Sequence, residues 1–106
     1  MKPMNPALHG VELPHAEIER FCARNQVRKL SLFGSILTNR FRPESDPDVL
    51  VEFEAGAAVT YLDLARMERE LSQLVGRKVD LRTPEELSRY FRERVVSEAL
   101  LQYERK

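Results

Sequence analysis

Three short stretches of the chain have the composition and spacing of β-strands. In the first, residues 27–33, side chains alternate between the two faces of a strand and become more apolar toward its end, where Gly34 and Ser35 stop it. Residues 48–53 are rich in valine, leucine and phenylalanine and predict a second strand. A third strand is expected over residues 77–81.

Around these stretches apolar residues recur at helical spacing. A first helix is expected over residues 14–26, and one or two helical turns over residues 36–41. A further helix is expected to begin at Thr60, whose spacing to Asp63 predicts a capping box, and to end at Gly76. The last helix is expected to run to the C-terminus on the stripe Phe91, Val95, Ala99 and Tyr103.

Helices therefore alternate with strands along a chain of 106 residues, which is the length of one small domain. This order predicts the α/β (α+β) class, with a sheet and helices packed on it. Residues 1–13 contain Pro3, Pro6 and Gly10 and predict a flexible N-terminal arm. Residues 14–106 are then expected to form the single domain.

Composition narrows the possible functions. Lys and Arg total 17, and Asp and Glu total 17, so the basic excess that grips nucleic acid phosphates is missing. No direct nucleic acid partner is expected. Cys22 is the single cysteine, which excludes an internal disulfide and indicates a reducing compartment, the cytoplasm. Neither a signal peptide nor a membrane-spanning run is evident, so no membrane role is expected.

Candidate chemistry lies at the ends of the expected strands. Asp46 and Asp48 are two residues apart, so an extended backbone presents both carboxylates on one face. Two adjacent like charges favour a bound cation, and Mg²⁺ takes carboxylate oxygens. Asp80 lies in the third strand and joins the pair if that strand neighbours the second. Gly34 and Ser35 open a strand-to-helix turn whose free amides suit a phosphate.

Each feature also has a purely structural interpretation. Residues 46–48 are compatible with a solvated turn, and Gly34-Ser35 with a plain strand-ending turn. Asp80 is compatible with an edge-strand acid that pairs with Arg77 or Lys78. The ordered combination of all these features favours the metal and phosphate site.

The same residues match a known pattern. LSLFGS, then ten residues, then DPDV and a later Asp80 resemble the signature of the DNA polymerase beta-like nucleotidyltransferase superfamily. The segment through YLDLARMERELSQLVGRKVDLRTPEEL is closer still to the minimal, MNT-type members, the MntA-like antitoxins. The resemblance extends over residues 15–103 and implies their fold, a small mixed β-sheet with helices packed on it.

The resemblance implies an enzyme that transfers AMP from ATP with Mg²⁺, a protein adenylyltransferase. Asp46, Asp48 and Asp80 would be catalytic and hold metal, and Gly34 and Ser35 would bind the nucleotide. Many such proteins neutralise a HEPN-type ribonuclease toxin, with which they form an oligomeric complex, by modifying one of its tyrosines. A domain of this size has little surface to enclose an acceptor, so a partner protein is the sensible substrate.

Two departures from the family pattern affect this interpretation. Thr38 and Asn39 stand where the family often carries Arg and Gly, so a basic group for the triphosphate is either shifted, to Arg40 or Arg42, or missing. Pro47 stands between the aspartates, where an aliphatic residue is usual. The alternative is therefore a catalytically degenerate fold that neutralises its toxin by binding only. Transfer to a small molecule is less favoured, because no second domain is available to enclose one.

Overall fold

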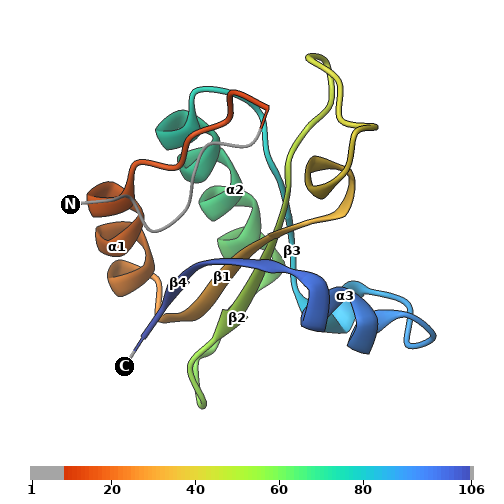
Figure 1. Ribbon diagram of the computed structural model, residues 1–106. Coiled ribbons are helices and arrows are strands. Elements are labelled where there is room, and N and C mark those ends of the chain that lie inside the picture. The colour runs from red at the N-terminus through yellow and green to blue at the C-terminus, as the bar shows by residue number, and fades with distance from the viewer. Residues whose placement is uncertain (1–8, 106) are drawn as a thin grey trace.

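The computed structural model describes residues 9–105, which form one four-stranded sheet with its helices (Figure 1). The elements in chain order are α1 (His15–Arg24), β1 (Val27–Phe33), the 3₁₀ turn η1 (Gly34–Leu37), β2 (Asp48–Phe53), α2 (Tyr61–Val75), β3 (Asp80–Arg82), the 3₁₀ turn η2 (Pro84–Glu86), α3 (Arg92–Glu98) and β4 (Leu100–Glu104).

The sheet is mixed, as expected. Its strand order is β3-β2-β1-β4, with β1 antiparallel to both of its neighbours and β2 parallel to β3. β1 ends before Gly34, and β2 runs antiparallel beside it, so that Phe33 lies opposite Asp48. The parallel pairing of β2 and β3 requires a crossover, and α2 supplies it.

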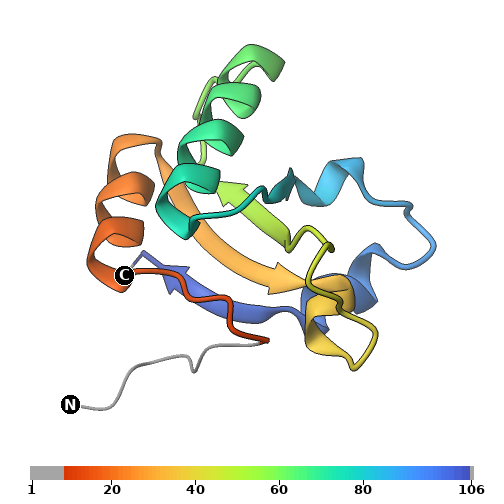
Figure 2. The ribbon, with the colours of Figure 1, turned by 90° about the horizontal axis from the view of Figure 1, so that it is seen from above.

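The two faces of the sheet differ in cover. Figures 1 and 2 show α1 and α2 together on one face, while α3 lies on the other side. The core fills the face under α1 and α2 and includes Ile18, Phe21, Leu30, Leu32, Val49, Val51, Met67, Leu71 and Leu81. Side chains alternate along a strand, so Asp48 and Asp80, which adjoin core residues, project from the opposite face.

Local capping signals are confirmed. Thr60 and Asp63 form the expected capping box, in which Thr60 N donates to Asp63 Oδ2 at 2.9 Å and Asp63 N donates to Thr60 Oγ1 at 3.2 Å. Gly76 ends α2 in the left-handed conformation, with φ of 84°. These predictions hold because the groups involved lie within one turn of each other.

The prediction of a last helix to the C-terminus is wrong. Only Arg92–Glu98 is helical, and Leu100–Glu104 forms β4 beside β1. The open edge of β1 carries unpaired N–H and C=O groups, and pairing with β4 satisfies them. Arg105 N continues the pairing to Arg28 O at 2.8 Å. Phe91, the first residue of the expected stripe, is 49% exposed.

Other boundaries shift for tertiary reasons. The expected third strand shortens to Asp80–Arg82, and the helical turn expected over residues 36–41 is the 3₁₀ turn Gly34–Leu37. The expected arm lies outside the described residues over positions 1–8. Residues 9–13 of the expected arm are described, and there Val11 is buried in the core at 3% exposure and Leu13 packs against that core. In residues 9–105, none of the helices has the length and apolar character to span a membrane.

Candidate active site

Gly34 forms a close contact between the end of β1 and the first residue of β2. Its φ of 79° lies in the left-handed region, where side chains other than glycine are strained. A Cβ atom at this position would lie 2.4 Å from Asp48 Oδ2. The space that a side chain would fill is therefore occupied by the Asp48 carboxylate, so glycine is required for two separate reasons.

Asp48 and Asp80 are direct neighbours across the parallel pair of β2 and β3. Burial raises the pKa of Asp48, and the negative charges of Asp80 and Asp46 raise it further, while Arg82 partly opposes them. The structure thus places Asp48 beside Asp80, and Asp46 is close enough for its charge to act on Asp48. Burial and these neighbouring charges make the negative form of Asp48 costly.

Pro47 places Asp46 beside this pair without disturbing the sheet. Strand β2 begins at Asp48, so the missing N–H of Pro47 removes no ladder bond. Its ring is fully buried, and its carbonyl accepts from Asp80 N at 2.8 Å. Pro47 therefore extends the contact between β2 and β3 and holds Asp46 just outside the strand.

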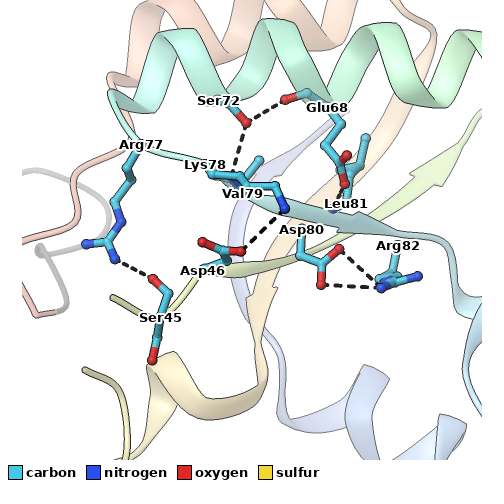
Figure 3. Close-up of polar contacts among 10 residues, drawn as sticks. All are labelled: Ser45, Asp46, Glu68, Ser72, Arg77, Lys78, Val79, Asp80, Leu81 and Arg82. Atoms are coloured by element: carbon cyan, nitrogen blue, oxygen red, sulfur yellow. Dashed lines mark hydrogen bonds and ion pairs between the residues drawn. The ribbon is translucent and has the colours of Figure 1, made fainter. Parts of the chain in front are cut away.

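Two basic side chains face the outer carboxylates (Figure 3). Lys78 Nζ lies 3.6 Å from Asp46 Oδ2, and Arg82 Nη2 lies 3.2 Å from Asp80 Oδ1. Asp80 is therefore an edge-strand acid with a basic partner, as the structural interpretation expected, but that partner is Arg82 and not Arg77 or Lys78. Residues 78, 80 and 82 alternate in the sequence, which is the signal that could have placed these charges on one face.

The donor set fits a divalent cation. Carboxylate oxygens are the ligands that Mg²⁺ prefers, and a cation among Asp46, Asp48 and Asp80 would relieve the repulsion that raises the pKa of Asp48. As the side chains stand, no group of three His, Cys, Asp or Glu residues in the described part of the chain converges on one point. The outer two carboxylates instead face Lys78 and Arg82.

Arg77 anchors the loop that leads into Asp46. Its Nη2 donates to Pro43 O at 2.9 Å and also to Ser45 O, and its guanidinium lies 5.2 Å from the centre of the Phe41 ring. Arg77, which was expected to open the third strand, instead contacts this loop and precedes β3. These contacts also tie the loop before the aspartates to the end of α2.

A cavity of about 550 Å³ opens beside the Gly-Ser turn. Gly34, Ser35 and Arg40 line one side of it, and Val95 and Glu98 of α3 also contribute. The sequence did not predict that Val95 and Glu98 line this cavity, because it predicted one long C-terminal helix in place of α3 and β4. The cavity joins the predicted phosphate-binding pair to a basic side chain.

Thr38 explains how Arg40 reaches that cavity. The Thr38 hydroxyl donates to Ser35 O at 2.8 Å, and Thr38 Oγ1 accepts from Arg40 N at 3.1 Å. Thr38 N also donates to Ser35 O at 2.9 Å. The residue that departs from the expected pattern therefore ties the backbone of Arg40 to the Gly-Ser turn.

A family model described as the nucleotidyltransferase domain matches residues 16–102. The chain belongs to this family. In this nucleotidyltransferase, the matched range contains all three aspartates and the Gly-Ser turn with the cavity that it lines. A candidate protein adenylyltransferase of Methanocaldococcus jannaschii is 35% identical over 77 residues, which are 73% of this chain and 81% of that protein.

Solved structures agree on the fold. A candidate minimal nucleotidyltransferase is 36% identical, with a TM-score of 0.66 over 81% of this chain and 86% of its own. A toxin-antitoxin complex with AMP-PNP is 19% identical, with a TM-score of 0.68 over 89% and 76% of the two chains. A complex of a tri-AMPylated Shewanella oneidensis HEPN toxin with its MNT antitoxin is 17% identical, with a TM-score of 0.60 over 86% and 70%. The fold is that of the minimal, polymerase beta-like nucleotidyltransferases.

Proposed function

We propose that this nucleotidyltransferase is the antitoxin of a HEPN/MNT pair and transfers AMP from ATP to a tyrosine of the HEPN ribonuclease toxin. The observation that carries the proposal is the alignment of Asp48 with Asp80 beside the Gly34 turn, next to a cavity lined by Ser35 and Arg40. The likeness to antitoxin structures, one of them bound to an AMPylated toxin, supports the choice of partner.

In the proposed reaction, the tyrosine oxygen attacks the α-phosphorus of ATP and forms a new P–O bond. The bond from that phosphorus to the oxygen of the β-phosphate breaks, and pyrophosphate leaves. Asp80 accepts the proton of the hydroxyl. Asp46, Asp48 and Asp80 would hold Mg²⁺, which when bound neutralises charge on the phosphate oxygens. Gly34 and Ser35 bind the triphosphate through the turn, and Arg40 supplies a positive charge.

The small size of the domain also supports a complex with the toxin. The domain is small, so the partner must present its own acceptor hydroxyl to the part of the sheet that bears Asp48 and Asp80. We place this activity in the cytoplasm, which supplies both ATP and a reduced environment for Cys22.

Intact-protein mass spectrometry of the HEPN toxin, after incubation with this protein, ATP and Mg²⁺, tests the proposal. We expect a gain of whole AMP units, and no gain with α,β-methylene-ATP, in which carbon replaces the oxygen of the bond to be broken. An unchanged toxin mass in a tight complex would overturn the proposal in favour of neutralisation by binding alone.

Removing the charge of Arg40 should weaken nucleotide binding. A hydrogen bond to a charged group contributes about 1.5–3 kcal/mol, so Arg40→Gln should raise the KM for ATP by roughly 10-fold or more. Arg42 is the matched control, since it is exposed and does not line the cavity. Steady-state kinetics should show Arg42→Gln within about twofold of wild type. Equal effects of the two substitutions would mean that Arg40 makes no specific phosphate contact.

A further inference from the structure

The strand that carries Asp80 lies at the edge of the sheet. β3 has three residues and pairs with β2 on one side only. Asp80 N donates toward that side, to Pro47 O at 2.8 Å. Successive amides of a strand point in opposite directions, so the amides of Val79 and Leu81 point away from β2. A strand this short, bonded along one edge, needs further contacts to hold Asp80 in place.

Helix α2 supplies those contacts with two side chains one turn apart (Figure 3). Val79 N donates to Ser72 Oγ at 3.0 Å, and Leu81 N donates to Glu68 Oε2 at 2.8 Å. The Ser72 hydroxyl donates in turn to Glu68 O at 2.7 Å. Val79 and Leu81 are 1% and 6% exposed, so these amides have little access to water as an alternative partner.

We propose that Glu68 and Ser72 are positioning residues for Asp80, and so set the arrangement of the carboxylate group. Resting on the proposed function, this inference assigns to α2 a role in the reaction. Three consecutive amides, of residues 79, 80 and 81, are bonded alternately to α2 and to the residue before β2. The Asp80 backbone is thereby held from both sides, at the position directly beside Asp48 in the sheet.

The role of Glu68 depends on an acceptor oxygen and not on its charge. Its Oε2 accepts from a neutral amide, so the carbonyl of glutamine can replace it. Glu68→Ala removes the acceptor and leaves the Leu81 amide unpaired, whereas Glu68→Gln keeps one. Glu70 provides the matched control, because it is a carboxylate of the same helix that pairs with Arg24 and Arg66 instead of β3.

The test compares these three variants with the wild type by their affinity for Mn²⁺, used as the probe ion and followed by electron paramagnetic resonance. Displaced supporting groups typically cost 10- to 100-fold in metal affinity or activity. We expect Glu68→Ala to weaken Mn²⁺ binding by about 10-fold and to lower kcat similarly, with the KM for ATP little changed. Glu68→Gln should recover to within about threefold, and Glu70→Ala should match the wild type.

Amide exchange followed by NMR provides a readout independent of catalysis. Val79 and Leu81 should exchange faster in Glu68→Ala, while amides of β1 stay protected. The proposal is overturned if Glu68→Ala keeps wild-type Mn²⁺ affinity and exchange, or if Glu68→Gln is as impaired as Glu68→Ala. Both readouts remain valid in a protein that transfers no AMP, so failure of the proposed function would be seen separately. Ser72→Ala should likewise weaken Mn²⁺ binding and speed amide exchange, because it removes the acceptor of the Val79 amide.

Discussion

A protein with both Asp46→Asn and Asp48→Asn will fail to transfer AMP to the toxin while remaining folded. Asparagine keeps the size of each side chain but removes the charge that a divalent cation requires. We expect a loss of transfer of at least about 100-fold, the upper end of what even supporting residues of metal sites cost. Intact mass of the toxin measures transfer, and circular dichroism checks the fold. Transfer at the wild-type rate would remove both aspartates from the mechanism.

The stability of Asp48→Asn has a predicted sign. Asp48 has a raised pKa in the folded protein, chiefly because it is partly buried and near Asp80. The folded state therefore binds this proton more tightly than the unfolded state does. Stability from Asp48 is present at low pH and is lost as the pH rises through the folded pKa. At neutral pH we expect Asp48→Asn to melt at a higher temperature than the wild type.

Asp63 is the matched control with the opposite sign. Its pKa is lowered, first by the hydrogen bond from the Thr60 backbone, in the capping box of α2. Its stabilisation is present above the unfolded pKa and is lost as the pH falls through the folded one. Asp63→Asn should therefore melt at a lower temperature than the wild type at neutral pH. If Asp48→Asn also lowered the melting temperature, the cost inferred from burial and from the neighbouring charges at Asp48 would be wrong.

Among glycine-to-alanine substitutions, we expect Gly34→Ala to reduce AMP transfer the most. The left-handed backbone costs an alanine about 1–2 kcal/mol. The added Cβ would also lie 2.4 Å from Asp48 Oδ2, so the carboxylate must move. A displacement of about 1 Å at a reacting centre can cost on the order of 100-fold in rate. We expect a loss of AMP transfer of that size together with a lower melting temperature.

Gly56 separates these two effects. Its φ of 85° imposes the same backbone strain, yet a Cβ there would meet nothing within 4 Å. Gly56→Ala should lower the melting temperature by a similar amount and leave transfer unchanged. Thermal melting and the intact-mass assay of all three proteins measure both effects. If Gly34→Ala were no less active than Gly56→Ala, its contact with Asp48 would have no role in the reaction.

The sequence predicted local elements better than pairing across the sheet. The capping box at Thr60 and the end of α2 at Gly76 follow from groups within one turn, so spacing alone places them. β4 was expected to be helical because residues 91, 95, 99 and 103 have helical spacing. Its strand conformation depends on β1, which is about seventy residues away in sequence and needs a partner for its open edge.

The candidate site divides in the same way. Gly34, Asp48 and Asp80 could be named from their order and residue types, and the strand pairing places them side by side. The groups around them could not be named. Lys78 reaches Asp46 only because β3 lies beside β2, whereas Arg82 pairs with Asp80 within β3 itself. Glu68 and Ser72 contribute because α2 packs along the edge of β3.

By itself, the sequence determined which residues of this nucleotidyltransferase are candidates for the chemistry, because charge, glycine freedom and short-range spacing are properties of the chain. Only the tertiary structure decided the distance between those residues and their neighbours. It placed Asp48 where Gly34 leaves room, and placed Arg40 and Glu98 around one cavity. Those contacts join segments far apart in sequence, and their free energy depends on packing and burial, which no local pattern of residues records.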